Sequence, residues 1–277
     1  AIGRNALSTQ NFTTATTTFN TAVGDRAGLS VTTGVQNTLI GGAAGDALTV
    51  GNNNVAVGYE SLSGDTKGDR NVAIGRAALQ AQNFTTSTDS YNIGVGYGAG
   101  ESITTGTENT LIGGLAGDAL TDADFNVAVG VAALSADTLG SKTVAIGTGA
   151  LQTQNFTTAT DTFNSAVGYL AGSAVTTGVH NTLLGGLAGD AITTGDSNTF
   201  LGKGAGSSTT TPDHNTGVGR DALFTNTTGA ENVSVGTAAM YYNTTGANNT
   251  AVGKSALDAN TTGSQNTAFG WNAMRSQ

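Results

Sequence analysis

The chain has no cysteine, a single proline, 6% aromatic residues and only 10% charged residues. Without cysteine, its fold depends on neither disulfides nor thiolate metal sites, and redox chemistry gives no information about its compartment. Ten Lys and Arg stand against 19 Asp and Glu and are spread along the chain, which excludes the basic stripe of a nucleic-acid-binding protein. No apolar run approaches the roughly 18 residues of a membrane span, so we expect no membrane insertion by this segment.

Glycine is abundant instead, with 42 residues, and it marks a repeat. The motif Asn-x-small-[Val/Ile/Leu]-Gly recurs throughout, and its glycines are 17 residues apart twelve times and 21 apart three times. They are Gly3, Gly24, Gly41, Gly58, Gly75, Gly96, Gly113, Gly130, Gly147, Gly168, Gly185, Gly202, Gly219, Gly236, Gly253 and Gly270. A period of this length predicts an all-β parallel solenoid of about 16 coils, in which each coil contacts its neighbours.

The order of the gaps predicts a single array over residues 1–277 with a higher repeat inside it. Gaps of 21, 17, 17 and 17 residues occur three times and define superrepeats 1–72, 73–144 and 145–216, followed by plain 17-residue coils over 217–277. Because the chain opens on Ala1 inside a motif, we expect a processed product or part of a longer protein. Motifs that run to both ends predict either further chain or end-to-end stacking of copies.

Each coil is numbered here from one to seventeen, with Asn249–Gln265 as the type. Position four is always a large apolar residue (Val252 in this coil), and its alternation with positions two and three predicts a short strand with one face inward. Position eight is Ala in fifteen of sixteen coils, so we expect positions four and eight to line a narrow lumen. On this basis Ile146→Ala costs about 2–5 kcal/mol and Ala133→Leu about 1–3 kcal/mol. Gly at position fifteen predicts a second corner with positive φ.

Asn recurs at position one in nearly every coil. In a parallel stack its amide can bond the same amide in the coils above and below, which predicts an Asn ladder; a separate Asx-turn in each coil is the alternative. The residues concerned are Asn20, Asn37, Asn54, Asn71, Asn92, Asn109 and Asn126, and Thr143 stands at the next place in the column.

Runs such as Asn54-Val55-Ala56-Val57-Gly58 and Asn126-Val127-Ala128-Val129-Gly130 resemble the head repeat of YadA-like trimeric autotransporter adhesins. Asn249 to Gly263 is also similar to arrays in phage tail fibres and large bacterial surface proteins. The resemblance covers essentially all of the chain and implies a left-handed β-roll that associates as a trimer and binds matrix or cell-surface ligands. The chain departs from adhesin heads in its longer period and in having Asn where they commonly have Ser.

The sequence offers no catalytic, cofactor-binding or metal site, because a repeat places the same group everywhere. His180 and His214 are single departures in loops, with no metal spacing between them. Asp46, Asp118 and Asp190 are four coils apart, roughly 19 Å, and are interpreted as solvated turn residues rather than weak calcium ligands. Lys or Arg after the motif glycine, as in Lys203, predicts a solvated charge, with contact to an anionic glycan as the alternative.

The three 21-residue coils carry an aromatic pair each, which predicts a surface ridge for a sugar or a protein groove. The alternative is packing of these rings onto their own roll or a neighbouring subunit. The residues are Phe12, Phe19, Phe84, Tyr91, Phe156 and Phe163. Asn-x-Ser/Thr triplets are weak signals for glycan acceptors; their residues are Asn11, Asn83, Asn155, Asn226, Asn243 and Asn260.

We therefore expect a structural or adhesive fibre module at the cell surface or outside the cell, assembled from copies of itself into a trimer or filament. A cell-surface glycan or matrix protein is the expected ligand. A phage tail-fibre shaft or receptor-binding segment is the alternative, and an ice-binding solenoid is less favoured because Val interrupts the Thr columns. An enzyme is disfavoured, because 17-residue coils leave no long cleft loops with clustered acids.

Overall fold

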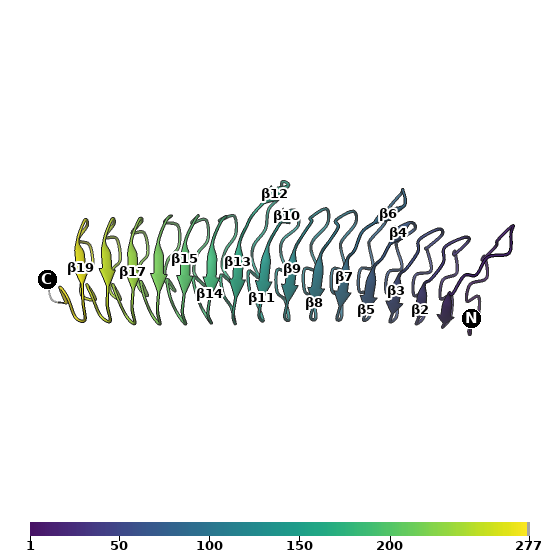
Figure 1. The fold of residues 1–277 in the computed structure, drawn as a ribbon, viewed down its shortest axis with the longest axis horizontal. Coiled ribbons are helices and arrows are strands. Elements are labelled where there is room, and N and C mark those ends of the chain that lie inside the picture. The colour runs from purple at the N-terminus through teal and green to yellow at the C-terminus, as the bar shows by residue number, and fades with distance from the viewer. Residues whose placement is uncertain (276–277) are drawn as a thin grey trace. The chain divides into compact units, whose positions relative to one another are not determined.

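The computed structural model describes residues 1–275, which form short strands and turns and contain no helix. The protein is a parallel β-solenoid with one three-residue strand in each of about 15 coils, as the repeat predicts (Figure 1). The chain divides into two compact units, Ala1–Ser141 with Thr157–Thr160, and Lys142–Phe156 with Asp161–Gln277.

The first unit contains seven of the three-residue strands. Each pairs in parallel with the next, and position four faces position four of the following coil, as Val57 faces Ile74. The strands are β1 (Thr21–Val23), β2 (Thr38–Ile40), β3 (Val55–Val57), β5 (Val72–Ile74), β7 (Ile93–Val95), β8 (Thr110–Ile112) and β9 (Val127–Val129). Two-residue strands β4 (Gly68–Asp69) and β6 (Thr88–Asp89) pair in parallel beside them, and β10 (Gly140–Ser141) follows.

The second unit contains the other eight three-residue strands. They pair in the same parallel register, as Leu184 with Leu201. They are β11 (Val144–Ile146), β13 (Ser165–Val167), β14 (Thr182–Leu184), β15 (Thr199–Leu201), β16 (Thr216–Val218), β17 (Val233–Val235), β18 (Thr250–Val252) and β19 (Thr267–Phe269). The short strand β12 (Thr160–Asp161) lies in a 21-residue coil, whose extra residues form one of the projecting loops in Figure 1.

The motif glycine is required at position five for two reasons. Gly58 has φ +141°, and a Cβ on it would lie 2.4 Å from the carbonyl oxygen of Gly75 in the next coil. No side chain fits that gap, and a φ in this region also favours glycine. The chain can therefore turn at position five only with glycine there.

Glycine at position fifteen does not have the positive φ expected of it. At Gly51 the constraint is contact, because a Cβ would lie 2.6 Å from the carbonyl oxygen of Gly68. The left-handed residue is at position seventeen instead, as at Asn53 with φ 59°. Positions seven and nine add two more left-handed residues in many coils, for example Glu60 and Leu62.

The interior is filled by positions three and eight together with either position nine or position twelve. Leu62 at position nine is accompanied by the polar Asp65 at position twelve, whereas Gly45 at position nine is accompanied by Leu48. The side chains of Leu62, Asp65 and Leu48 are fully buried. The large apolar side chain is therefore supplied by position nine in some coils and by position twelve in others. This keeps the interior volume of a coil nearly constant.

Candidate functional site

Position four of the coils forms a partly exposed apolar stripe in each unit, in which most of the Val side chains are half-buried. We expected these residues inside, and this prediction is wrong: Ile40, Ile112 and Leu184 are 38%, 40% and 48% exposed. In the first unit the stripe is Val23, Ile40, Val57, Ile74, Val95, Ile112 and Val129. In the second unit it is Ile146, Val167, Leu184, Leu201, Val218, Val235, Val252 and Phe269.

The stripe is exposed because each strand has three residues and only the middle one points inward. In β8, Leu111 is fully buried while Thr110 and Ile112 on either side are partly exposed. The lumen is narrow, so several coils accept only Ala at the middle position, as at Ala56. The larger β-branched residues are thus placed on the outer surface.

The stripe and the position-two residues beside it carry no charge in any of the described strands. Fully burying a Val or Ile side chain contributes about 1.5–3 kcal/mol, so covering the exposed part of Ile40 or Ile112, 38% and 40%, corresponds to roughly 0.5–1 kcal/mol each. Contiguous exposed apolar surface is uncommon on soluble proteins, so the stripe is a candidate interaction surface.

Position six, two residues beyond the stripe, carries aromatic and cationic side chains. In the first unit, the Arg76 guanidinium lies over the ring of Tyr97 at 5.4 Å, and its Nη1 donates to the Tyr97 hydroxyl at 3.1 Å. Tyr59, Tyr97 and Tyr169 are each more than half exposed. The cations here were noted in the sequence, but the three tyrosines between them were missed.

The predicted aromatic ridge is wrong for two of its six residues, which pack onto their own roll as the alternative expected. Phe19, Tyr91 and Phe163 are at least half exposed, whereas Phe84 and Phe156 are 6% and 7% exposed and pack inward. Phe12 is half-buried.

The three exposed rings do not stack on one another. The Arg70 guanidinium lies over the Tyr91 ring, with its Cζ 5.5 Å from the ring centroid. Arg70 also forms an ion pair with Asp89. In the second unit, Phe163 lies 5.3 Å from the Lys142 ammonium and stacks on His180 with centroids 5.8 Å apart. The rings of Tyr91 and Phe163 therefore fix their own projecting loops against an adjacent coil.

Position one forms a buried column of Asn side chains. The Asn54 Oδ1 accepts the backbone N–H of Asn71 at 2.9 Å and its Nδ2–H at 3.2 Å, and the Asn54 Nδ2 donates to the carbonyl of Gly68 at 2.9 Å. The amide thus joins successive coils and also closes its own coil. Thr143 interrupts the column and bonds the Thr162 hydroxyl and the Gln154 amide instead.

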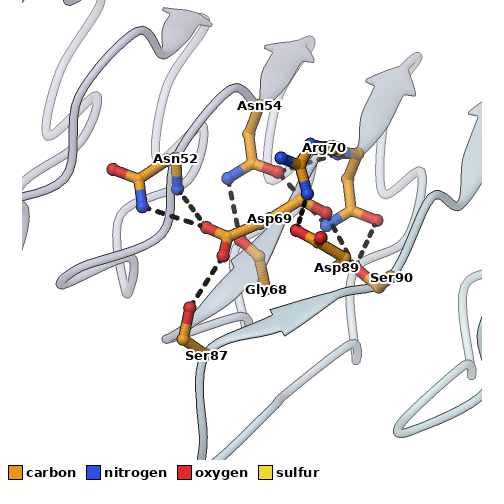
Figure 2. A network of polar contacts seen from close by, with 9 residues as sticks. Asn52, Asn54, Gly68, Asp69, Arg70, Ser87, Asp89 and Ser90 are labelled. Carbon is orange, nitrogen blue, oxygen red and sulfur yellow. Dashed lines mark hydrogen bonds and ion pairs between the residues drawn. The ribbon is translucent and has the colours of Figure 1, made fainter.

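A second ladder, missed in the sequence, is formed by polar residues at position sixteen (Figure 2). The Asp69 carboxylate accepts the backbone N–H of Asn52 at 2.6 Å and the Ser87 hydroxyl at 2.7 Å. Asn52 in turn accepts the backbone N–H of Val35 at 2.9 Å. The ion pair between Arg70 and Asp89, also in Figure 2, fastens the loop of the 21-residue coil beside it.

The glycosylation signals divide by burial. Asn11, Asn83 and Asn155 are exposed, but Asn226, Asn243 and Asn260 are at most 7% exposed and are not available as acceptors. These last three form an internal amide ladder, in which the Asn243 Nδ2 donates to the Asn226 Oδ1 at 2.8 Å and the Asn260 Nδ2 to the Asn243 Oδ1 at 2.9 Å.

The titratable residues singled out in the sequence are not brought together. His180 and His214 are exposed, as predicted. Asp46 and Asp118 are half-buried rather than fully solvated, and burial raises the pKa of both carboxyls. Asp190 is also half-buried and accepts the Ser207 hydroxyl at 2.6 Å.

Across residues 1–275, no three His, Cys, Asp or Glu side chains are placed to hold a metal ion together, and no helix suited to crossing a bilayer is present. The exposed surface of the repeat is therefore the candidate site. No protein-family model matches the chain, and comparisons with curated proteins and with solved structures find no match.

Proposed function

We propose that the chain is a structural and adhesive module of an extracellular or cell-surface fibre, whose copies associate laterally through the apolar stripe. The observation that carries the proposal is the uncharged column of Val, Ile and Leu left exposed along the strands of both units. On a chain of net charge −9, an uncharged face is where copies approach with least repulsion.

The partner proposed is a second copy of this chain. Coils within a unit follow one another at roughly 4.8 Å, so a surface with the same spacing engages every coil of that unit at once. From position two to position six, each coil offers at most about 80 Å² of footprint. The seven strand-bearing coils of the first unit and the eight of the second each provide an area of the same order as the roughly 800 Å² per partner of a stable interface.

Three copies are proposed, from the resemblance to adhesin heads, with the surfaces away from the stripe left free for attachment. The exposed rings Phe19, Tyr91 and Phe163 are the candidate contacts for a cell-surface glycan or matrix protein. Aromatic faces suit both kinds of ligand, because they stack on apolar sugar faces and fill protein grooves.

Sedimentation velocity over a range of concentrations tests the assembly. Ile112→Lys places a charge in the stripe at a partly exposed side chain, so the coil stays folded while association is lost. Thr86→Lys, at an exposed loop residue, is the matched control and assembles like the unsubstituted chain. An unsubstituted chain that stays monomeric at every concentration, or an Ile112→Lys chain that assembles normally, overturns the proposal.

A further inference from the structure

Three glycines at position six are not required by the backbone of the chain. Gly42, Gly114 and Gly186 do not have positive φ. A Cβ at Gly114 would meet no atom within 4 Å, at Gly186 only the Tyr169 carbonyl oxygen at 3.9 Å, and at Gly42 only the exposed ring of Tyr59, at 3.3 Å. At Gly42 the Tyr59 ring would have to shift, but Ala would fit at Gly114 and Gly186. Glycine costs conformational entropy on folding, so its use at these two positions points to a contact outside the chain.

In six coils, three with Gly and three with Tyr at position six, the size of the neighbouring stripe residue varies in the opposite direction. The coils with Gly at position six carry the larger Ile40, Ile112 and Leu184 at position four. The coils with Tyr59, Tyr97 and Tyr169 at position six carry the smaller Val57, Val95 and Val167. Two residues apart, the Cα atoms of each pair are within about 7 Å of each other.

Solvent imposes no such compensation, because water fills any space beside an exposed side chain. A packed interface does impose it, since the volume at each level must be filled without voids or overlap. Three coils with a cation at position six are exceptions, because the stripe residue beside it is large: these are Ile2 with Arg4, Ile74 with Arg76, and Leu201 with Lys203. Of the three cations, Arg76 leans over Tyr97 in the following coil. Phe269 and Trp271 are both large and do not follow the pattern.

We propose that positions four and six form a size code by which copies of this chain recognise one another in axial register. This rests on the proposed lateral association and adds its specificity. The stripe alone permits slippage, because strands of nearly identical residues pair almost equally well after a shift of one coil. With the code, a shift of one coil is unfavourable. It brings Ile112 of one copy level with Tyr97 of the other, where the two side chains overlap. It also brings Gly114 level with Val129, where a void is left.

The partner that fits the code is again this chain, because the arrangement recurs with the 72-residue superrepeat. In the first unit, Gly42 and Gly114 are 72 residues apart, and Ile40 and Ile112 recur with them. A partner whose surface repeats with another period fits the coil of Gly42 or the coil of Gly114, but not both.

The first test replaces the position-four and position-six residues of one coil by those of another and measures the dissociation constant of the assembly. Gly114→Tyr overfills its level and is expected to raise the dissociation constant about tenfold, as overpacking by about 1.4 kcal/mol does. Ile112→Val with Gly114→Tyr recreates the Val95 and Tyr97 pair. It removes only one methylene against the added ring, so it is expected to recover part of the lost affinity. Thr86→Tyr adds a ring away from the stripe as the control. Thermal melts under dissociating conditions confirm that each variant folds.

The second test measures the axial register between copies by cross-linking. The chain has no cysteine, so an introduced cysteine is the only thiol that reacts. Tagged Val57→Cys copies are mixed with untagged Val95→Cys copies and treated with a short bis-maleimide. The code predicts cross-links between like substitutions and few between unlike ones.

The outcomes separate the two proposals. A monomeric unsubstituted chain overturns the association itself. Assembly with equal cross-linking of like and unlike pairs, or a Gly114→Tyr chain that associates as tightly as the unsubstituted one, overturns the size code alone. Failure of the double substitution to recover association also overturns it, because compensation within one level is what the code asserts.

Discussion

Ala145 and Ile146 are adjacent in β11 and lie on opposite faces of it: Ala145 is fully buried, whereas Ile146 is 36% exposed. The smaller residue fills the lumen, and the larger one belongs to the stripe. The expected cost of about 2–5 kcal/mol for Ile146→Ala, which assumed a buried side chain, therefore does not follow from the structure.

The same relationship in β14 gives a sharper comparison. Leu183 is fully buried and Leu184 is 48% exposed. Leu183→Ala leaves a cavity and is expected to lower the free energy of unfolding by about 2–5 kcal/mol, whereas Leu184→Ala lowers it by less than about 1.5 kcal/mol in the dissociated chain. Urea denaturation of both variants measures this, and equal losses would show that the two faces are wrongly assigned.

Ala133 at position eight is fully buried, as the strict Ala column predicts. Ala133→Leu forces three more heavy atoms into a closely packed lumen and is expected to cost about 1–3 kcal/mol. Ala132→Leu is the natural control, since residue 132 has nearly the same left-handed φ (53°) as Leu115 (57°) in the previous coil. A melting temperature unchanged by Ala133→Leu would mean that the lumen has room to spare.

The sequence predicted the solenoid because period and alternation do not depend on detail: each motif glycine must turn, and each strand must pair with the next. It did not predict which apolar column faces inward. Size suggested Ile146 and its equivalents, but the narrow lumen favours the smaller middle residue Ala145. An uncharged, partly exposed column looks like an interior in a sequence, since both consist of Val and Ile.

The aromatic and glycosylation signals failed for a similar reason. Phe84 and Tyr91 belong to one 21-residue coil, yet the first ring is buried and the second is exposed. Asn226 resembles an acceptor site by its triplet, but position twelve points inward in its coil, as it does at Leu48 and Asp65. The exchange between positions nine and twelve is visible in the sequence and would have placed this residue.

Thr209 occupies position twelve of its coil and is fully buried, and its hydroxyl has no hydrogen-bond partner among the described residues. An unsatisfied buried hydroxyl costs about 1–3 kcal/mol. Thr209→Val keeps the shape and removes the polar atom, so we expect it to raise the free energy of unfolding by about 1 kcal/mol. Calorimetry that finds Thr209→Val less stable would indicate an ordered water bound to this hydroxyl.

Asp65 is fully buried, and burial raises the pKa of its carboxyl despite hydrogen bonds from Gln82 and backbone N–H groups. A carboxyl with a raised folded-state pKa stabilises the fold most when it is protonated. This contribution is present below the unfolded pKa of about 4 and is lost as pH rises through the folded-state value. The unsubstituted chain is therefore expected to gain stability relative to Asp65→Asn as pH falls from 7 to about 4, in denaturation series at several pH values. A constant difference between the two chains would mean that the carboxylate is as well solvated by its donors as by water.

The Asn column makes the strongest demand on a single residue. Asn54→Ala removes the acceptor of the Asn71 backbone N–H and the donor to the Gly68 carbonyl, and both groups are buried. Since an orphaned buried polar group costs about 1–3 kcal/mol, we expect Asn54→Ala to lower the free energy of unfolding by about 2–4 kcal/mol. Asn52→Ala, two residues earlier, also removes an acceptor, but its bond from the Val35 N–H is only part-buried. We therefore expect water to replace this acceptor and the loss to be below about 1 kcal/mol. Hydrogen exchange of the Asn71 backbone amide separates the two variants. We expect this exchange to be faster in Asn54→Ala, because the hydrogen bond from the Asn71 N–H to the preceding coil is gone. An unchanged rate would show that strand pairing alone holds successive coils together.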